Sequence, residues 1–256
     1  YMRAGQIREV EYWLQKAALH PRTFYGLIAA RSLGWNVAFN WQMPEYREHH
    51  DKLLKSIKVA RRAMALVETG QFHLADLELR RLNADKNPLL RESLIAYANK
   101  ADLASLVMRL AEAYEHPSGH FYDAALFPVS PWNPEGGYNI DRALIHALIR
   151  QESRFNPAVE SHSGAVGLMQ VMPKTATYVA HDRRYARKNG NHLLKDPHLN
   201  VTIGQQYISD LMEQYYVDDE LFSLLIAYNA GPGNLRRWKQ QFEDMQHDPL
   251  LFIESI

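Results

Sequence analysis

The chain has 256 residues, of which 46% are hydrophobic and 23% charged, so it can bury a sizeable core as one large domain or two smaller ones. Lysine plus arginine and aspartate plus glutamate each total 29, so the overall charge gives no argument for a nucleic-acid partner or an anionic membrane. The lack of cysteine excludes disulfides, thiolate zinc sites and cysteine nucleophiles, and the chemistry must use oxygen or nitrogen groups.

The first residues show no pattern that is typical of a targeting signal. Tyr1 opens no charged-then-apolar segment, and no run of about 18 apolar residues predicts a membrane span. We therefore expect a mature chain or an excised piece of a longer protein.

The first part of the chain predicts helices, because apolar residues recur at three- and four-residue spacing and alternating strand patterns are absent. The pattern favours an all-α fold, and short connections favour antiparallel helix pairs. No fixed-period repeat points to a specific repeat family. The expected helices span residues 4–18, 21–33, 45–68, 71–82, 87–98 and 101–114.

Prolines and glycines then recur between His116 and Gly137, and such a segment cannot hold a regular helix. We take residues 117–137 as a connector. It separates a helical domain at residues 1–116 from a second domain at residues 138–256.

The second domain is also predicted to be helical. Asn139 is the expected N-cap of a helix that runs to Arg154, and Pro173 suits the first turn of another. The polar stretch 182–197 is expected to be an exposed loop. Further elements are a glycine-bearing loop at 161–167 and helices at about 198–216, at 219–229 and from Asn234 onwards.

Glu152 lies near the end of the first of these helices. At 100° per residue it falls in one apolar stripe with Ile145, Leu148 and Ile149. A carboxyl group against apolar surface loses hydration in its charged form, which raises its pKa and suits a general acid. Periodicity alone favours the alternative of an exposed or salt-bridged glutamate, with Arg150 and Arg154 as available partners.

Two later segments carry polar groups in apolar surroundings. In SHSGAVGLMQVMP, from Ser161 to Pro173, the Gln170 amide either bonds backbone in the core or faces a ligand rich in hydroxyl and acetamido groups. In AYNAGPGNLRRW, which starts at Ala227, Tyr228 either donates a hydrogen bond into a cleft or fills the core.

Together these segments resemble the signature of the soluble lytic transglycosylases. The matching stretches are Glu152-Ser153, Gly167 to Gln170 and Ala227 to Pro232, in this order, and the resemblance covers about residues 138–240. Upstream, residues 18–34 are similar to the end of the superhelical domain of the large members. The helices up to about residue 114 are similar to the linker domain of those members.

The resemblance implies a goose-lysozyme-like α domain after a superhelix-tail and linker segment, without cofactor or metal. Its activity would be cleavage of the β-1,4 bond between N-acetylmuramic acid and N-acetylglucosamine of peptidoglycan, with 1,6-anhydromuramyl products, in the periplasm. Glu152 would be the sole acid and base. Ser161, Gln170, Tyr228 and Asn229 would bind or orient the sugars, and Met169 would line the cleft.

Two features depart from the family pattern. The chain stops at FIESI, whereas family members usually continue with a segment that helps complete the domain, so we expect the second domain to be incomplete. Of the long superhelical ring that large members carry, only the tail could be present.

Three other functions stay open. A hydrolase of the same fold would activate water with help from further acidic residues, for which Asp182, Asp196 and Asp210 are candidates. A non-catalytic scaffold would bind glycan without turnover. A metal enzyme is disfavoured, because the histidines show no H-E-x-x-H spacing and the neighbours His49 and His50 are typical of a solvated face.

Overall fold

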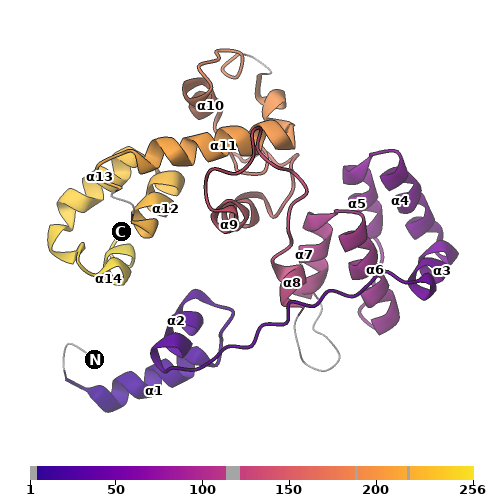
Figure 1. Ribbon diagram of the computed structural model, residues 1–256, viewed down its shortest axis with the longest axis horizontal. Coiled ribbons are helices and arrows are strands. Elements are labelled where there is room, and N and C mark those ends of the chain that lie inside the picture. Colours follow the sequence, from indigo (N-terminus) through magenta and orange to yellow (C-terminus); the bar gives the residue numbers. More distant parts are fainter. Residues whose placement is uncertain (1–4, 114–121, 188–189, 218–219) are drawn as a thin grey trace. The chain divides into compact units, whose positions relative to one another are not determined.

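The computed structural model describes residues 5–113, 122–187, 190–217 and 220–256 (Figure 1). Within these ranges the chain is helical and has no β-strand, which confirms the all-α fold. Two isolated bridges, Glu160 with Val166 and Val166 with Val171, fold back one loop.

Contacts group the chain into two compact units. The first comprises Tyr1–Met43 and Glu115–Ala124, and the second comprises Pro44–Tyr114 and Ala125–Ile256. The domain division at 117–137 stays a prediction, and residues 117–121 of that connector lie outside the described part of the chain.

The first unit contains α1 (Ile7–Ala18) and α2 (Phe24–Ser32), which pack against each other. The Thr23 side chain caps α2 by accepting a hydrogen bond from the Gly26 amide at 3.0 Å. A side chain at Gly26 would meet the His20 carbonyl oxygen at 1.9 Å, so only glycine fits this approach.

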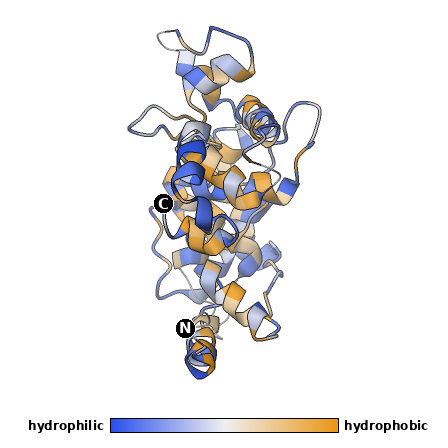
Figure 2. Ribbon diagram, turned by 90° about the vertical axis from the view of Figure 1, so that its left-hand side faces the viewer, coloured by the Kyte–Doolittle hydropathy of each residue, from blue (hydrophilic) through white to orange (hydrophobic). Residues whose placement is uncertain are grey.

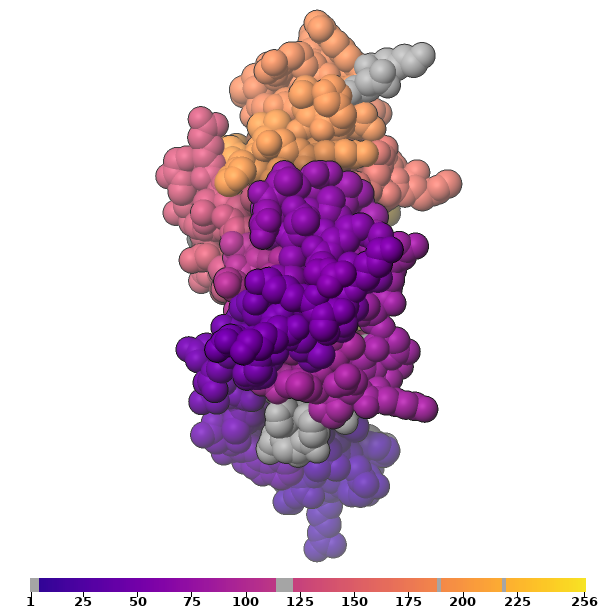
Figure 3. Space-filling view, turned by 90° about the vertical axis from the view of Figure 1, so that its right-hand side faces the viewer, coloured from indigo at the N-terminus to yellow at the C-terminus, as the bar shows by residue number. Residues whose placement is uncertain are grey.

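The second unit begins with five helices, in which α4 packs against α3 and α5, and α6 packs against α3 and α7; the space-filling view shows α3 to α6 as one continuous surface (Figure 3). They are α3 (Glu48–Ser56), α4 (Lys58–Glu68), α5 (Phe72–Leu79), α6 (Pro88–Lys100) and α7 (Ala104–Ala113).

Two expectations for these helices are wrong. The single helix expected over 45–68 is broken at Ile57, which takes an extended conformation (φ −97°, ψ 119°) and separates α3 from α4. His50 is buried, not solvated, and its Nδ1 accepts a hydrogen bond from the Arg47 amide at 3.1 Å. That bond caps the start of α3, a role that side-chain type alone does not indicate.

The remaining elements also depart locally from the sequence prediction. Asp141 caps α9 in place of Asn139, whereas Pro173 does begin α10 as expected. The stretch 182–197 holds a 3-10 helix whose Leu194 is fully buried, and residues 123–126 form a short helix within the expected connector. The elements are α8 (Asp123–Leu126), α9 (Arg142–Ser153), α10 (Pro173–Val179), η2 (Gly190–Lys195), α11 (Pro197–Met212), α12 (Leu221–Ala230), α13 (Pro232–Gln241), η3 (Glu243–Met245) and α14 (Pro249–Ile253).

One hydrophobic core joins α9 to its neighbours. Ile145 and Ile149 of α9 are fully buried in it together with Leu168, and α7 contributes Ala104 and Met108. The helices carry hydrophobic and hydrophilic residues side by side, as amphipathic elements do (Figure 2). In the described part of the chain, no helix combines the length and the hydropathy that a membrane span requires.

Candidate active site

A cleft of about 850 Å³ lies between α9 and α12. Most of its wall is apolar, and its polar side chains gather where the two helices end, except for Asp141 at the start of α9. The lining residues are Asp141, Ala143, Leu144, Ala147, Leu148, Gln151, Glu152, Leu221, Phe222, Leu225, Ile226, Tyr228, Asn229 and Ile253.

Glu152 is a half-buried carboxylate on the wall of this cleft, in the last turn of α9. Among the described residues, its side chain makes no hydrogen bond and no ion pair. Burial raises the pKa of Glu152 above the ordinary value of a glutamate, since no cation offsets the lost hydration. Such a group can hold a proton at a higher pH than a solvated glutamate.

The two arginines that could have neutralised Glu152 point elsewhere. Arg154 donates a hydrogen bond to Glu112 of α7, and the Arg150 guanidinium lies 3.9 Å from the same carboxylate. Arg150 also donates to the Leu126 carbonyl at 3.0 Å. The alternative in which Glu152 forms a salt bridge with Arg150 or Arg154 is therefore wrong.

The turn that follows Glu152 has an unusual backbone. Arg154 and Phe155 both take left-handed conformations, with φ of 52° and 62°, although neither is glycine. Each such residue costs on the order of 1–3 kcal/mol and persists only where its surroundings hold it. Phe155 is held by the core, where it is 1% exposed.

The loop before α10 is fixed by Asn200 of α11, which the sequence analysis missed. The fully buried Asn200 amide donates to the carbonyls of Val166 and Leu194 and accepts from the Met169 amide, each at 2.8 Å. A side chain at Gly167 would meet the Asn200 nitrogen at 2.4 Å, so this packing requires glycine. The available signal was a lone amide beside apolar residues in α11.

Ser161 and Gln170 hold the same loop and do not line the cleft around Glu152. The Ser161 hydroxyl accepts from the Ala165 amide at 2.9 Å. Gln170 has a left-handed backbone (φ 47°), and its side-chain nitrogen donates to the Gly167 carbonyl at 3.0 Å. The backbone-bonding alternative for Gln170 is the one that the structure contains.

Tyr228, which lines the cleft, is hydrogen-bonded to Met169, which does not. The Met169 side chain is fully buried against Gly204 and does not line the cleft, contrary to the expectation. Its carbonyl oxygen instead accepts a hydrogen bond from the Tyr228 hydroxyl at 2.7 Å. Burial, and then the neighbouring Glu152 carboxylate, raise the pKa of Tyr228, so its hydroxyl stays protonated.

The candidate second carboxylates serve local structure. Asp182 pairs with Arg184, Asp196 caps α11, and Asp210 accepts from Gln206. Asp141 does line the cleft, but it caps the start of α9, 11 residues before Glu152 and hence about 16 Å away along the helix axis. Catalytic carboxylate pairs lie about 5–9.5 Å apart.

Residues 133–250 match the family described as Transglycosylase SLT domain. The soluble lytic murein transglycosylase of Escherichia coli (strain K12) is 38% identical over 120 residues, which cover 47% of this chain and 18% of that protein. Membrane-bound lytic murein transglycosylase C of Photorhabdus laumondii is 37% identical over 106 residues, covering 39% and 30% of the two chains.

Comparison with solved structures also finds soluble lytic transglycosylases. The crystal structure of the 70 kDa soluble lytic transglycosylase from Escherichia coli matches 99% of this chain and 40% of its own, with a TM-score of 0.76 and 25% identity. The complex of that enzyme with bulgecin A has a TM-score of 0.79, also at 25% identity and with the same coverage. The resemblance to the soluble lytic transglycosylases is confirmed, and this chain spans less than half the length of the relatives that it matches.

Proposed function

We propose that this chain carries the catalytic domain of a lytic transglycosylase that cuts peptidoglycan between N-acetylmuramic acid and N-acetylglucosamine. The observation that carries the proposal is Glu152, a half-buried carboxylate of raised pKa on a cleft wall, which no cation of the described part of the chain neutralises. The named activity of the relatives, lytic murein transglycosylase, supports the same reaction. A peptidoglycan substrate would place the protein in the periplasm.

Glu152 would serve as both acid and base. Its carboxyl proton passes to the glycosidic oxygen as the bond from that oxygen to the anomeric carbon of the muramyl residue breaks. The resulting carboxylate then takes the proton of the muramyl 6-hydroxyl, whose oxygen bonds to the same anomeric carbon. The product is a 1,6-anhydromuramyl end, and no water is consumed.

The carboxylates of the cleft favour this route over hydrolysis. Most glycoside hydrolases use two carboxylates at a short separation, whereas Asp141 lies at the opposite end of α9 from Glu152. An internal hydroxyl needs no second protein base. Tyr228 and Asn229, which line the cleft beside Glu152, would orient the sugars.

The remaining assignments are proposals of the same kind. Residues 1–116 would form a superhelix tail and linker domain, residues 117–137 the connector, and residues 138–256 the lysozyme-like domain. Ser161, Gln170 and Met169 would act on the sugars only through the loop and the Tyr228 hydroxyl that they hold.

The test is digestion of purified sacculi in water labelled with heavy oxygen, followed by mass spectrometry of the released muropeptides. We expect anhydromuramyl ends without label. Labelled reducing ends would favour a lysozyme-like hydrolase, and binding without release would favour a glycan-binding scaffold.

A further inference from the structure

We infer that Glu112 of the linker helix α7 is a positioning residue for Glu152. The inference rests on the proposed function, because it gives Glu112 a task only if Glu152 carries out the chemistry. Glu112 does not line the cleft. It acts through Arg150 and Arg154, which lie two positions before and two positions after Glu152.

One carboxylate serves both arginines. Nη2 of Arg154 donates a hydrogen bond to Oε2 of Glu112, and Nη2 of Arg150 lies 3.9 Å from Oε1. The Arg150 Nε also donates to the Leu126 carbonyl at 3.0 Å, and its guanidinium lies 4.8 Å from the centre of the Phe127 ring. Arg150 is thus held on several sides, and Glu112 connects it to Arg154.

The geometry of α9 links the position of Arg150 to the direction of the Glu152 side chain. Successive residues of an α-helix are 100° apart, so residues 150 and 152 project on nearly opposite sides of α9. Tying Arg150 to α7 therefore directs Glu152 toward the cleft. Arg154, four positions after Arg150, lies on the same side of the helix as Arg150; its amide donates to the Arg150 carbonyl at 3.2 Å, and its own backbone is left-handed.

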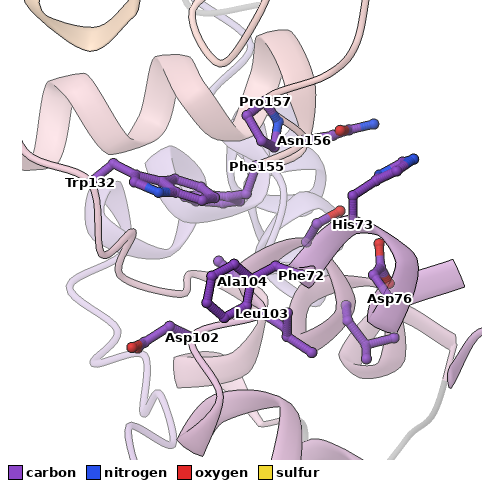
Figure 4. A pocket seen from close by; sticks show the side chains of 12 residues that line it. Phe72, His73, Asp76, Asp102, Leu103, Ala104, Trp132, Phe155, Asn156 and Pro157 are labelled. Carbon is purple, nitrogen blue, oxygen red and sulfur yellow. The ribbon is translucent and has the colours of Figure 1, made fainter. Parts of the chain in front are cut away.

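The helix that carries Glu112 is a firm support. Ala104 and Met108 of α7 lie in the same buried cluster as Ile149 and Phe155. The turn after Glu152 lies against this support as well. Phe155, Asn156 and Pro157 line a cavity of about 60 Å³ together with linker residues, and Trp132 lies beside Phe155 (Figure 4).

Replacing Glu112 should slow turnover without weakening binding. A misplacement of the reacting group by about 1 Å can cost on the order of 100-fold in rate, so we expect Glu112→Ala to lower kcat about 10- to 100-fold. The sacculus concentration at half-maximal rate should change less than about twofold, because the cleft wall is untouched. Amide hydrogen exchange in a peptide covering residues 150–156 should become faster.

The chain offers a matched control. Glu78 of α5 also holds two arginines, Arg62 and Arg81, the latter at 3.3 Å, and neither of these arginines belongs to α9. Glu78→Ala removes the same kind of group from the linker helices. It should leave kcat and the exchange of residues 150–156 unchanged.

A charge exchange separates positioning from folding. Glu112→Arg should lower kcat as Glu112→Ala does, and adding Arg154→Glu should restore a large part of it by rebuilding the pair in reverse. Unchanged turnover and unchanged exchange at 150–156 in Glu112→Ala would overturn the inference, as would an equal effect of Glu78→Ala. A wild-type protein that releases nothing from sacculi contradicts the proposed function instead, and the exchange rates then decide whether Glu112 holds the end of α9.

Discussion

Asp123 of the first compact unit and Glu152 of the second are both carboxylates withdrawn from water, and their surroundings differ in kind. Asp123 is fully buried, accepts two hydrogen bonds from Arg22 at 2.7 and 2.9 Å, and accepts another from the Asn40 amide at 2.7 Å. Glu152 is half-buried and has neither a cation nor a hydrogen-bond donor among the described residues. In the first arrangement the carboxylate is paired with a cation, whereas in the second no cation among the described residues offsets the burial that raises the pKa of the carboxyl group.

The two nearby arginines make the contrast sharper. Arg150 and Arg154 stand close to Glu152 in sequence, yet both are turned to Glu112. The two cations that could neutralise Glu152 therefore bind Glu112 instead. A raised pKa at this position depends on where two neighbouring side chains go, as well as on burial.

The largest effect is expected for Glu152→Gln, which keeps the size of the side chain and removes its dissociable proton. General acid and base assistance is worth about 10²–10⁴-fold, and one residue would supply both, so turnover should fall at or beyond the upper end. Binding to sacculi should survive. Release of muropeptides and co-sedimentation measure the two properties.

Glu160→Gln is the control for this variant. Glu160 is exposed, pairs with Lys195 at 3.3 Å and accepts from Asn191 at 3.0 Å, outside the cleft. Its replacement should change turnover little. Near wild-type digestion by a folded Glu152→Gln protein would show that another group is the acid.

Asp123→Asn should give the next largest effect, on stability. Breaking a buried ion pair costs about 3–5 kcal/mol, and because the Arg22 side chain keeps 30% exposure we expect about 2–3 kcal/mol. The free energy of unfolding in urea measures it. The control is Glu45→Gln, which removes an exposed ion pair with Arg47 and should lower the free energy of unfolding by less than about 0.5 kcal/mol. Equal losses of stability in the two variants would contradict the conclusion that Asp123 is a structural ion-pair partner.

Tyr228→Phe should have a smaller effect. It removes the hydrogen bond to the Met169 carbonyl, and a neutral hydrogen bond contributes about 1 kcal/mol. Because the hydroxyl points to Met169, turnover should fall less than about tenfold. A loss as large as that of Glu152→Gln would mean that Tyr228 takes part in proton transfer.

The smallest expected effect is on how the free energy of unfolding varies with pH. Burial disfavours the charged form of Glu152, so its pKa is higher in the folded than in the unfolded protein. At acid pH, below both values, the group is neutral in both states and carries no penalty. As the pH rises through the ordinary range of a glutamate and past the raised pKa, the folded protein loses stability.

Glu152→Gln imitates the neutral form and should therefore be slightly more stable than wild type at neutral pH. The difference should vanish on acidification, as measured by thermal unfolding at several pH values. A difference that grows toward acid pH would mean that Glu152 has a hidden partner. The rate of the wild-type protein should fall as the pH rises through the raised pKa, because the acid must begin protonated.

Local features were predictable where one short segment decides them. The apolar stripe of α9 and the start of α10 at Pro173 both follow from neighbouring residues. The split between α3 and α4 was not predictable, because no proline or glycine marks the break at Ile57. The buried Leu194 was missed because polar neighbours concealed it.

The order of residues is enough to predict that this protein is helical, that Glu152 lies on an apolar stripe, and that three ordered segments match a transglycosylase domain. The groups that surround the carboxyl group follow from the packing of the helices. Glu112 and Arg154 are 42 residues apart, and the Tyr228 hydroxyl and the Met169 carbonyl are 59 residues apart. Periodicity fixes the face on which a side chain stands, but its partner comes from another helix, because packing of the core sets which faces meet.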